Sequence, residues 1–260
     1  DVRYFSVSGK DSSAEFARDK LQEWGVKAEV FEDESRPTTL KQRFRASGKT
    51  LLRVSHLRQH DISHQIMSAF VTAVKTALQN SDLVIFSDFN YGCLPQPLVE
   101  EISEVCRQKN ILMVADSQSS SQVGDVSRFK DMLLLTPTER EARLAVRDFN
   151  SGLVVLAEKL RIKACSENII LTLDSEGMIA HAASKDDGAW HTDRLPAFNT
   201  APKDSSGAGD SLLACCSMAM AVGADIWKSM YLGSIAAACQ VSRVGNTPLS
   251  PRDIRLELAD

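Results

Sequence analysis

The sequence has no excess of positive charge and no long run of apolar residues. Its 30 Lys and Arg residues are balanced by 34 Asp and Glu residues, which gives a formal net charge of -4. Nucleic acids and anionic lipid surfaces attract proteins with surplus positive charge, so the sequence predicts no nucleic-acid partner. The most apolar stretch, at 212–222, is well short of the about 20 residues that a membrane-spanning helix needs. No membrane partner is expected either.

The cysteines form no C-x-x-C pair and have no partnering cluster of histidines. Zinc sites and disulfide frameworks usually carry such spacing, so neither is expected here. Most of the cysteines fall in apolar patterns, where a free thiol behaves as a small hydrophobic group. Free thiols are typical of a reducing compartment, which predicts a cytoplasmic protein. The six are Cys93, Cys106, Cys165, Cys215, Cys216 and Cys239.

Short apolar segments alternate with helical patterns along most of the chain. Strands are predicted at 83–87, 111–115, 132–136 and 168–173, with helices between them. Such alternation is typical of an α/β fold in which helices cover both faces of a mostly parallel sheet. Residues 38–55 differ, because apolar and charged residues alternate around Ser47 and Gly48. This pattern predicts an antiparallel β-hairpin.

Polar clusters follow several of the predicted strands. Asp88 and Asp116 each come directly after a strand, and the segments at 136–141 and 173–177 follow two others. In an open parallel sheet, ligands bind outside the carboxyl ends of the strands. Asp88 and Asp116 are equally compatible with a functional role and with turn formation.

A glycine-rich turn at 206–209 runs into Asp210 and then into an apolar helical pattern. Successive amide groups at a helix start form an array of donors that suits a phosphate group. Asp210 would lie in the first helical turn, where its charge is favoured whatever its function. If a phosphate binds there, the carboxylate is placed to take a proton from an attacking hydroxyl group. The helix that follows is apolar nearly all round and is expected to be buried.

The segment "DSSGAGD", Asp204–Asp210, resembles the late signature Asp-Thr-x-Gly-Ala-Gly-Asp of the ribokinase-like sugar kinases, also called the phosphofructokinase B family. Other family-like segments come in the same order, among them "RPTTLKQRFRASGKTLLRV" at 36–54, "LTPTEREA" at 135–142 and "VGNTPLSP" at 244–251. The nearest similarity within the family is to heptose phosphate kinase domains. The resemblance implies a three-layer α/β sandwich with a small β lid. It also implies ATP-dependent phosphorylation of a sugar or sugar phosphate.

The resemblance also implies roles for individual residues. Asp210 would be the base, and the amides of Gly207, Ala208 and Gly209 would form the anion hole. Glu141 would help to organise Mg²⁺. The expected cofactors are ATP and Mg²⁺, and the resemblance leaves open whether a monovalent cation is a third cofactor. The nucleotide would lie along Thr172, Asp174, Gly177, Gly245 and Asn246. The acceptor would meet Lys41, Arg43, Arg53 and Asp88, although basic residues on a hairpin are more often simply solvated.

The resemblance covers nearly the whole chain, so 1–260 is expected to be a single kinase domain with the hairpin as part of its lid or acceptor side. The family's usual N-terminal strand and sugar-binding segment are expected to be missing or supplied separately. Thr138 replaces an Asn of the family and Gln118 replaces a Lys. A catalytically impaired nucleotide- or sugar-binding module is therefore the alternative. A dinucleotide-dependent enzyme is disfavoured because G-x-G-x-x-G is absent. Exposed hairpin edges would allow a homodimer.

Overall fold

The computed structural model describes residues 1–46, 49–119, 123–183 and 189–258. The chain forms two compact units. The first unit contains residues 1–81 and 90–109, and the second contains residues 82–89 and 110–260. The single kinase domain over 1–260 stays a prediction.

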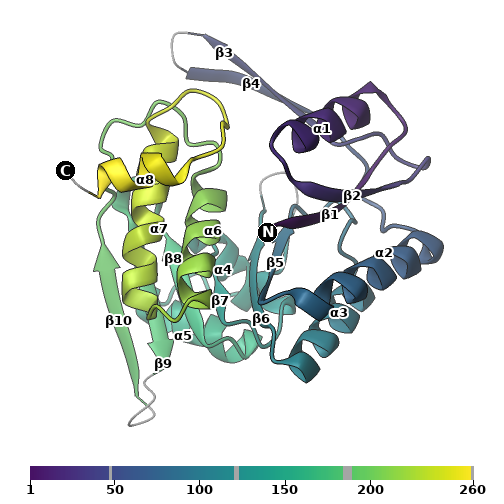
Figure 1. Cartoon of the computed structure of the whole chain (residues 1–260). Helices are drawn as coiled ribbons and strands as arrows, with labels where there is room; N and C mark the ends of the chain where they lie inside the picture. Colours follow the sequence, from purple (N-terminus) through teal and green to yellow (C-terminus); the bar gives the residue numbers. More distant parts are fainter. Residues whose placement is uncertain (47–48, 120–122, 184–188, 259–260) are drawn as a thin grey trace. The chain divides into compact units, whose positions relative to one another are not determined.

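The first unit contains a two-stranded parallel sheet, made by β1 (Arg3–Ser8) and β2 (Lys27–Glu32). Helix α1 (Ser12–Glu23) connects the two strands, as expected from the sequence. The Asp11 carboxylate caps this helix through Ala14 N, and its second oxygen accepts a hydrogen bond from Thr38 N. Helices α2 (His64–Ala77) and α3 (Gln96–Lys109) pack side by side in the same unit (Figure 1).

The predicted hairpin is confirmed as the antiparallel pair β3 (Leu40–Ala46) and β4 (Lys49–His56). Its expected turn at Ser47 and Gly48 lies outside the described residues. Successive side chains of a strand point to opposite faces, so Leu40 and Phe44 share one face and Lys41 and Arg43 share the other. The hairpin therefore has an apolar face and a basic face.

The second unit is built on a sheet of six strands in the order β10-β9-β8-β7-β6-β5. Strands β5 to β8 are parallel, whereas β9 and β10 are antiparallel to their neighbours. The mostly parallel sheet predicted from the sequence is therefore confirmed. The strands are β5 (Leu83–Asp88), β6 (Leu112–Ser117), β7 (Leu134–Leu135), β8 (Asn168–Thr172), β9 (Met178–Ala183) and β10 (Trp190–Leu195).

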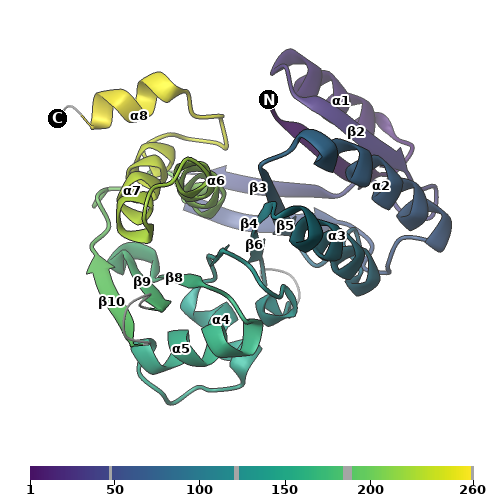
Figure 2. The same ribbon diagram turned by 60° about the horizontal axis from the view of Figure 1, so that its bottom comes forward.

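Helices cover both faces of this sheet. Figure 2 shows α6 (Ala208–Ala221) and α7 (Ile226–Val241) on one side and α4 (Glu139–Val146) and α5 (Leu153–Ala164) on the other. A short helix, α8 (Pro251–Glu257), follows α7. The arrangement gives three layers, as the resemblance implies.

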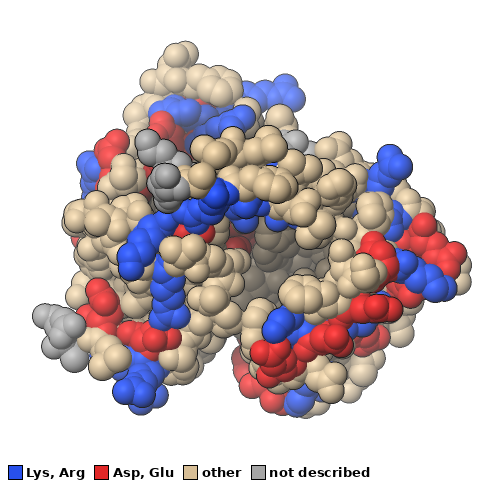
Figure 3. Space-filling view, turned by 90° about the horizontal axis from the view of Figure 1, so that it is seen from above, with Lys and Arg blue, Asp and Glu red and all other residues tan. Residues whose placement is uncertain are grey.

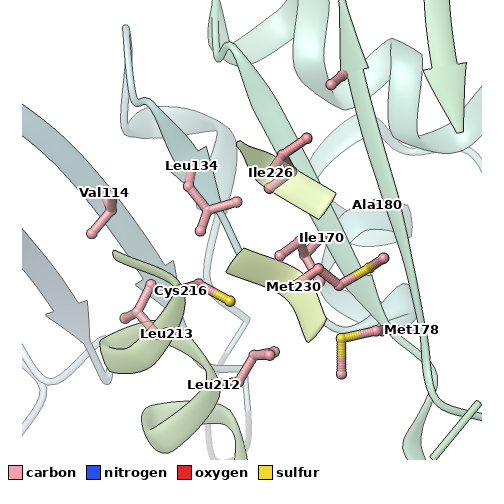
Figure 4. Packing of buried hydrophobic residues seen from close by; sticks show 11 residues of the cluster. Val114, Leu134, Ile170, Met178, Ala180, Leu212, Leu213, Cys216, Ile226 and Met230 are labelled. Atoms are coloured by element: carbon pink, nitrogen blue, oxygen red, sulfur yellow. The ribbon is translucent and has the colours of Figure 1, made fainter. Parts of the chain in front are cut away.

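The core of the second unit lies between the sheet and the pair α6 and α7. Figure 4 shows Leu212, Cys216 and Met230 from these helices packed toward Ile170 and Leu134 of the sheet. The two helices approach closely at Gly233, where an added Cβ atom would lie 2.4 Å from Cys216 Sγ. The expected burial of α6 holds for several of its apolar residues, among them Leu212 and Cys216, but not for Met218, which is 55% exposed. Part of the apolar surface of α6 therefore lies outside the core.

The six cysteines are free thiols in the structure, and four of them are buried. Over the described part of the chain, no helix combines the length and the apolar character that crossing a membrane requires.

Candidate active site

The glycine-rich turn begins α6 with a backbone that only glycine adopts easily. Gly207 has φ 80° and precedes Ala208, the first residue of the helix. A Cβ atom at position 207 would lie 2.1 Å from Asn246 Oδ1, so both conformation and space require glycine. Asp210 is half-buried in the first helical turn. The sequence prediction of a turn entering a helix at this place is confirmed, and the first amides of that helix have no intrahelical partner.

Asp204, the first residue of the resembling segment, bonds both to the residue before the turn and to a distant loop. Its Oδ1 accepts hydrogen bonds from Ser206 N at 3.1 Å and from Ser206 Oγ at 2.9 Å. Its Oδ2 accepts a hydrogen bond from Gly245 N at 3.2 Å. The turn is therefore tied to the loop that follows α7, although 41 positions separate Asp204 from Gly245.

Four carboxyl groups meet where β5, β6, α4 and α6 come together. Asp116, near the end of β6, is buried. Burial first, and then the negative charges of Glu141, Asp210 and Asp88, together raise its pKa to about 8. Two of these residues, Asp88 and Asp116, come from the ends of neighbouring parallel strands. Asp116 belongs to this group of carboxyl residues, although sequence reasoning left it open between a functional residue and a turn former.

Glu141 is held firmly at the start of α4. Its Oε1 accepts a hydrogen bond from Ser119 N at 2.6 Å, and its Oε2 accepts from Thr138 N at 2.9 Å and from Thr138 Oγ1 at 2.7 Å. Thr138 in turn caps the helix through Glu141 N. Thr138 thus supports the same helix start from the position where the family has Asn.

The two neighbouring carboxyl groups of Asp116 and Glu141 fit the way in which kinases hold Mg²⁺. That ion usually takes one or two protein carboxylates and completes its shell with water and substrate phosphates. Within the described ranges, no group of three or more His, Cys, Asp and Glu side chains is arranged to hold a metal by itself. The role of Glu141 as a metal residue stays a prediction, and Asp116 is the additional candidate.

Asp88 lies at the end of β5 and is paired with Arg128. The Arg128 Nη2 atom is 2.8 Å from Asp88 Oδ2, and the Asp88 side chain is only 3% exposed. The guanidinium group also lies 4.4 Å from the centre of the Phe129 ring. Sequence reasoning missed Arg128, which follows Asp88 by 40 positions and lies in the short helix η2 (Val126–Arg128). The ion pair brings a positive charge to the carboxyl cluster.

A family model described as pfkB family carbohydrate kinase matches residues 1–253. The chain belongs to the pfkB family. This membership confirms the resemblance found in the sequence and places the chain among the carbohydrate kinases, which are phosphotransferases.

The curated relatives of this pfkB chain include two proteins called bifunctional protein HldE. The one from Desulfatibacillum aliphaticivorans is 27% identical over 264 residues, which cover 100% of this chain and 52% of that protein. The one from Helicobacter hepaticus is 28% identical over 260 residues, which cover 95% of this chain and 50% of that protein. The chain spans about half the length of the curated relatives that it matches.

Solved structures support the fold of this pfkB chain. Phosphofructokinase-2 from Escherichia coli, in complex with potassium, matches with a TM-score of 0.78 and 13% identity, covering 99% of this chain and 81% of that chain. Ribokinase from Giardia lamblia matches with a TM-score of 0.77 and 18% identity, covering 99% and 82%. At these identities the likeness shows the ribokinase-like fold alone.

The residues expected along the nucleotide fall into two groups in the pfkB chain. Thr172 ends β8, and Asp174 and Gly177 form the turn that leads into β9. Gly177 has φ 92°, and a Cβ atom there would lie 2.0 Å from Leu195 O. The backbone conformation and the lack of space therefore explain why this position is a glycine. Gly245 and Asn246 lie against the glycine-rich turn instead. Contact with a nucleotide stays a prediction for all five.

The basic residues expected to meet the acceptor lie together on the hairpin of the first unit. Arg43 pairs directly with Arg53 across β3 and β4, and Lys41 lies on the same face as Arg43. Like charges opposite one another destabilise a hairpin, so a bound anion would reduce the repulsion between Arg43 and Arg53. Figure 3 shows that side chains of both charges reach the surface on the viewed face, in keeping with the near balance of 30 basic and 34 acidic residues. The acceptor role of Lys41, Arg43 and Arg53 stays a prediction.

Arg128→Ala is expected to lower the free energy of unfolding by about 2–3 kcal/mol, because it leaves the buried Asp88 carboxylate without its cation. Ser117 Oγ, 3.4 Å from Asp88 Oδ2, compensates for only part of this loss. Urea unfolding of the purified protein measures the change. Arg128→Lys, which keeps the charge, is the matched control and should lose less. An Arg128→Ala variant as stable as the wild type would show that the pair does not matter for folding.

Proposed function

We propose that this chain transfers the γ-phosphoryl group of ATP to a hydroxyl group of a sugar or sugar phosphate. A heptose phosphate is the first acceptor to test, because the curated relatives include HldE proteins and the sequence resembles heptose phosphate kinase domains. The observation that carries the proposal is the start of α6. There Gly207, in a left-handed backbone conformation, precedes the helix, and Asp210 lies in the first helical turn, where its charge acts on Asp116 as that of Glu141 does.

In this proposal each group at the helix start has one task. The amides from Gly207 to Gly209 donate to the oxygens of the transferring phosphoryl group, whose negative charge the helix dipole also stabilises. Asp210 accepts the proton of the acceptor hydroxyl as that oxygen attacks phosphorus. Asp116 and Glu141 would hold Mg²⁺, which supplies charge neutralisation on the ATP phosphates when it is bound. Positioning and charge account for most of the rate in such transfers.

The acceptor side of the proposal uses charge as well. Lys41, Arg43 and Arg53 would bind the phosphate that a sugar phosphate already carries, and Asp88 would accept a hydrogen bond from a sugar hydroxyl. A monovalent cation is included as an activator, since the related Escherichia coli phosphofructokinase-2 was solved with potassium. We further propose a homodimer through hairpin edges and a cytoplasmic location, the latter supported by the free thiols.

A second candidate is a module that binds nucleotide or sugar without catalysis. It is favoured by Glu141, whose two oxygens already accept three hydrogen bonds, and by the substitutions at Thr138 and Gln118. Two measurements on the same preparation separate the candidates. Calorimetry with ATP and Mg²⁺ reports binding, and a coupled assay reports ADP release.

The ADP-release assay is run over free sugars, fructose phosphates, heptose phosphates and nucleosides. We expect turnover with at least one phosphorylated sugar, and a rate that depends on its concentration. Binding of ATP without ADP release across the whole panel would reject the kinase and support the module.

A further inference from the structure

Gln240 is a buried polar residue at the end of α7. Its side chain is 1% exposed, although a glutamine amide loses free energy when it is buried without hydrogen-bond partners. Its Nε2 atom lies 3.4 Å from Ser206 O and 3.4 Å from Asn246 Oδ1. Both distances are at the long end of the hydrogen-bond range. The two N–H groups of the Gln240 side chain thus face the carbonyl oxygen of Ser206, which precedes Gly207, and the side chain of Asn246, which lies against Gly207.

Asn246 occupies the space that a side chain at position 207 would need. Its Oδ1 lies 2.1 Å and its Cγ lies 2.9 Å from the place of a Cβ atom on Gly207. The side-chain amide of Asn246 therefore packs against the backbone of Gly207. Since Gln240 donates toward the same Oδ1, it helps to set where Asn246 lies.

The end of α7 also bonds to the backbone that leads into the turn. Val241 O accepts hydrogen bonds from Lys203 N at 2.7 Å and from Asp204 N at 3.3 Å. Together with the contact of Asp204 and Gly245, these bonds fasten the segment 203–207 to the last turn of α7 and to the loop after it. Gln240 is the buried side chain at the centre of this attachment.

We propose that Gln240 is a positioning residue for phosphoryl transfer, which holds Ser206 and Asn246 so that the amides of the Gly207 turn keep the geometry of an anion hole. This inference rests on the proposed function. It deepens that function by adding a residue outside the glycine-rich motif. Misplacing the groups that hold a reacting phosphoryl group is expected to lower the rate without abolishing ATP binding.

The test compares Gln240→Met with Ser229→Ala in the full chain. Methionine has a similar length and lacks both donors. Ser229 is a fully buried polar residue on the same helix, whose hydroxyl donates to Asp225 O and is not among the contacts that hold the turn. Both variants are expected to lose some thermal stability. Only Gln240→Met is expected to change the turn.

The first readout is hydrogen exchange of the amides at 207–210, which does not depend on activity. Gln240→Met is expected to speed this exchange about tenfold, whereas Ser229→Ala leaves it unchanged. The second readout is kinetic. Gln240→Met is expected to lower kcat about 10- to 100-fold with the KM for ATP changed less than about threefold.

The outcomes distinguish a failure of the positioning role of Gln240 from a failure of the proposed function. Unchanged exchange at 207–210 in Gln240→Met overturns the positioning role, and so does an unchanged kcat in an active protein. A wild type that turns over no acceptor, combined with faster exchange in Gln240→Met, overturns the proposed function and supports the attachment of the turn. If Gln240 has only a structural role, the two variants should show equal hydrogen exchange at 207–210 and equal kcat when they are compared at the same stability.

Discussion

Asp210→Asn is expected to lower kcat by about 10²- to 10⁴-fold, which is the usual contribution of a positioned general base. Asparagine keeps the size of the side chain but does not take up the proton of the acceptor hydroxyl. The amides of the Gly207 turn and the start of α6 are unchanged in this variant. Affinity for Mg²⁺ and ATP should therefore stay within a few-fold of the wild type. Steady-state kinetics and calorimetry measure the two quantities.

Asp225→Asn is the matched control for this substitution. Asp225 caps α7 through Lys228 N, and asparagine caps helices about as well as aspartate does. The control removes one acidic charge near a helix start but should leave kcat unchanged. Full turnover by Asp210→Asn would remove Asp210 from the mechanism. An equal loss in the control would point to a general effect of charge.

Asp116→Asn is expected to make the protein more stable at pH 8 and to change how stability depends on pH. Burial and the nearby carboxylates raise the pKa of Asp116 to about 8, whereas an aspartate in the unfolded chain has a pKa of about 3.9. Between these two pKa values, the carboxyl group of Asp116 is ionised in the unfolded chain but still protonated in the folded protein. The free energy of unfolding therefore falls as pH rises, by up to about 1.4 kcal/mol per pH unit from this one group.

Urea unfolding at several values between pH 5 and pH 8 measures this dependence. The stability of the wild type should fall relative to Asp116→Asn across the interval, because asparagine does not titrate. The exposed Asp82, substituted by Asn, serves as the control for loss of one acidic charge. Parallel curves for the wild type and Asp116→Asn would show that the carboxyl of Asp116 does not titrate in this range.

The local elements and the turn were predictable because their signals lie close together in the sequence. Two glycines around an alanine before a long apolar pattern indicate a helix start, and α6 begins at Ala208. Apolar segments bounded by polar residues likewise predicted β5, β6 and β8. In each case the physical cause, a periodic pattern or a backbone requirement, acts over a few residues.

Contacts between distant residues were not predictable in the same way. Nothing near Arg128 in the sequence indicates that it pairs with Asp88, because their meeting depends on how η2 follows β6. The raised pKa of Asp116 depends on burial and on three other carboxylates from separate elements. The exposure of Met218 depends on how far the neighbouring layers extend over α6.

Thr138 shows how the structure changes the meaning of a substitution. From the sequence, the loss of a family asparagine at position 138 is one reason to keep a catalytically impaired module as the alternative. In the structure, the threonine hydroxyl and the Glu141 carboxylate form a reciprocal cap at the start of α4. The position of Glu141 is therefore held by local hydrogen bonds and does not depend on an asparagine at position 138.

The proposed function depends on one step, the transfer of a phosphoryl group from ATP to an alcohol at the start of α6. The most direct test follows the radiolabelled γ-phosphate of ATP in the presence of a phosphorylated sugar. We expect label in the acceptor, in an amount equal to the ADP formed, and a rate of labelling that is lower by about 10²- to 10⁴-fold with Asp210→Asn. Label found only in inorganic phosphate, or transferred equally well by that variant, would contradict the proposal.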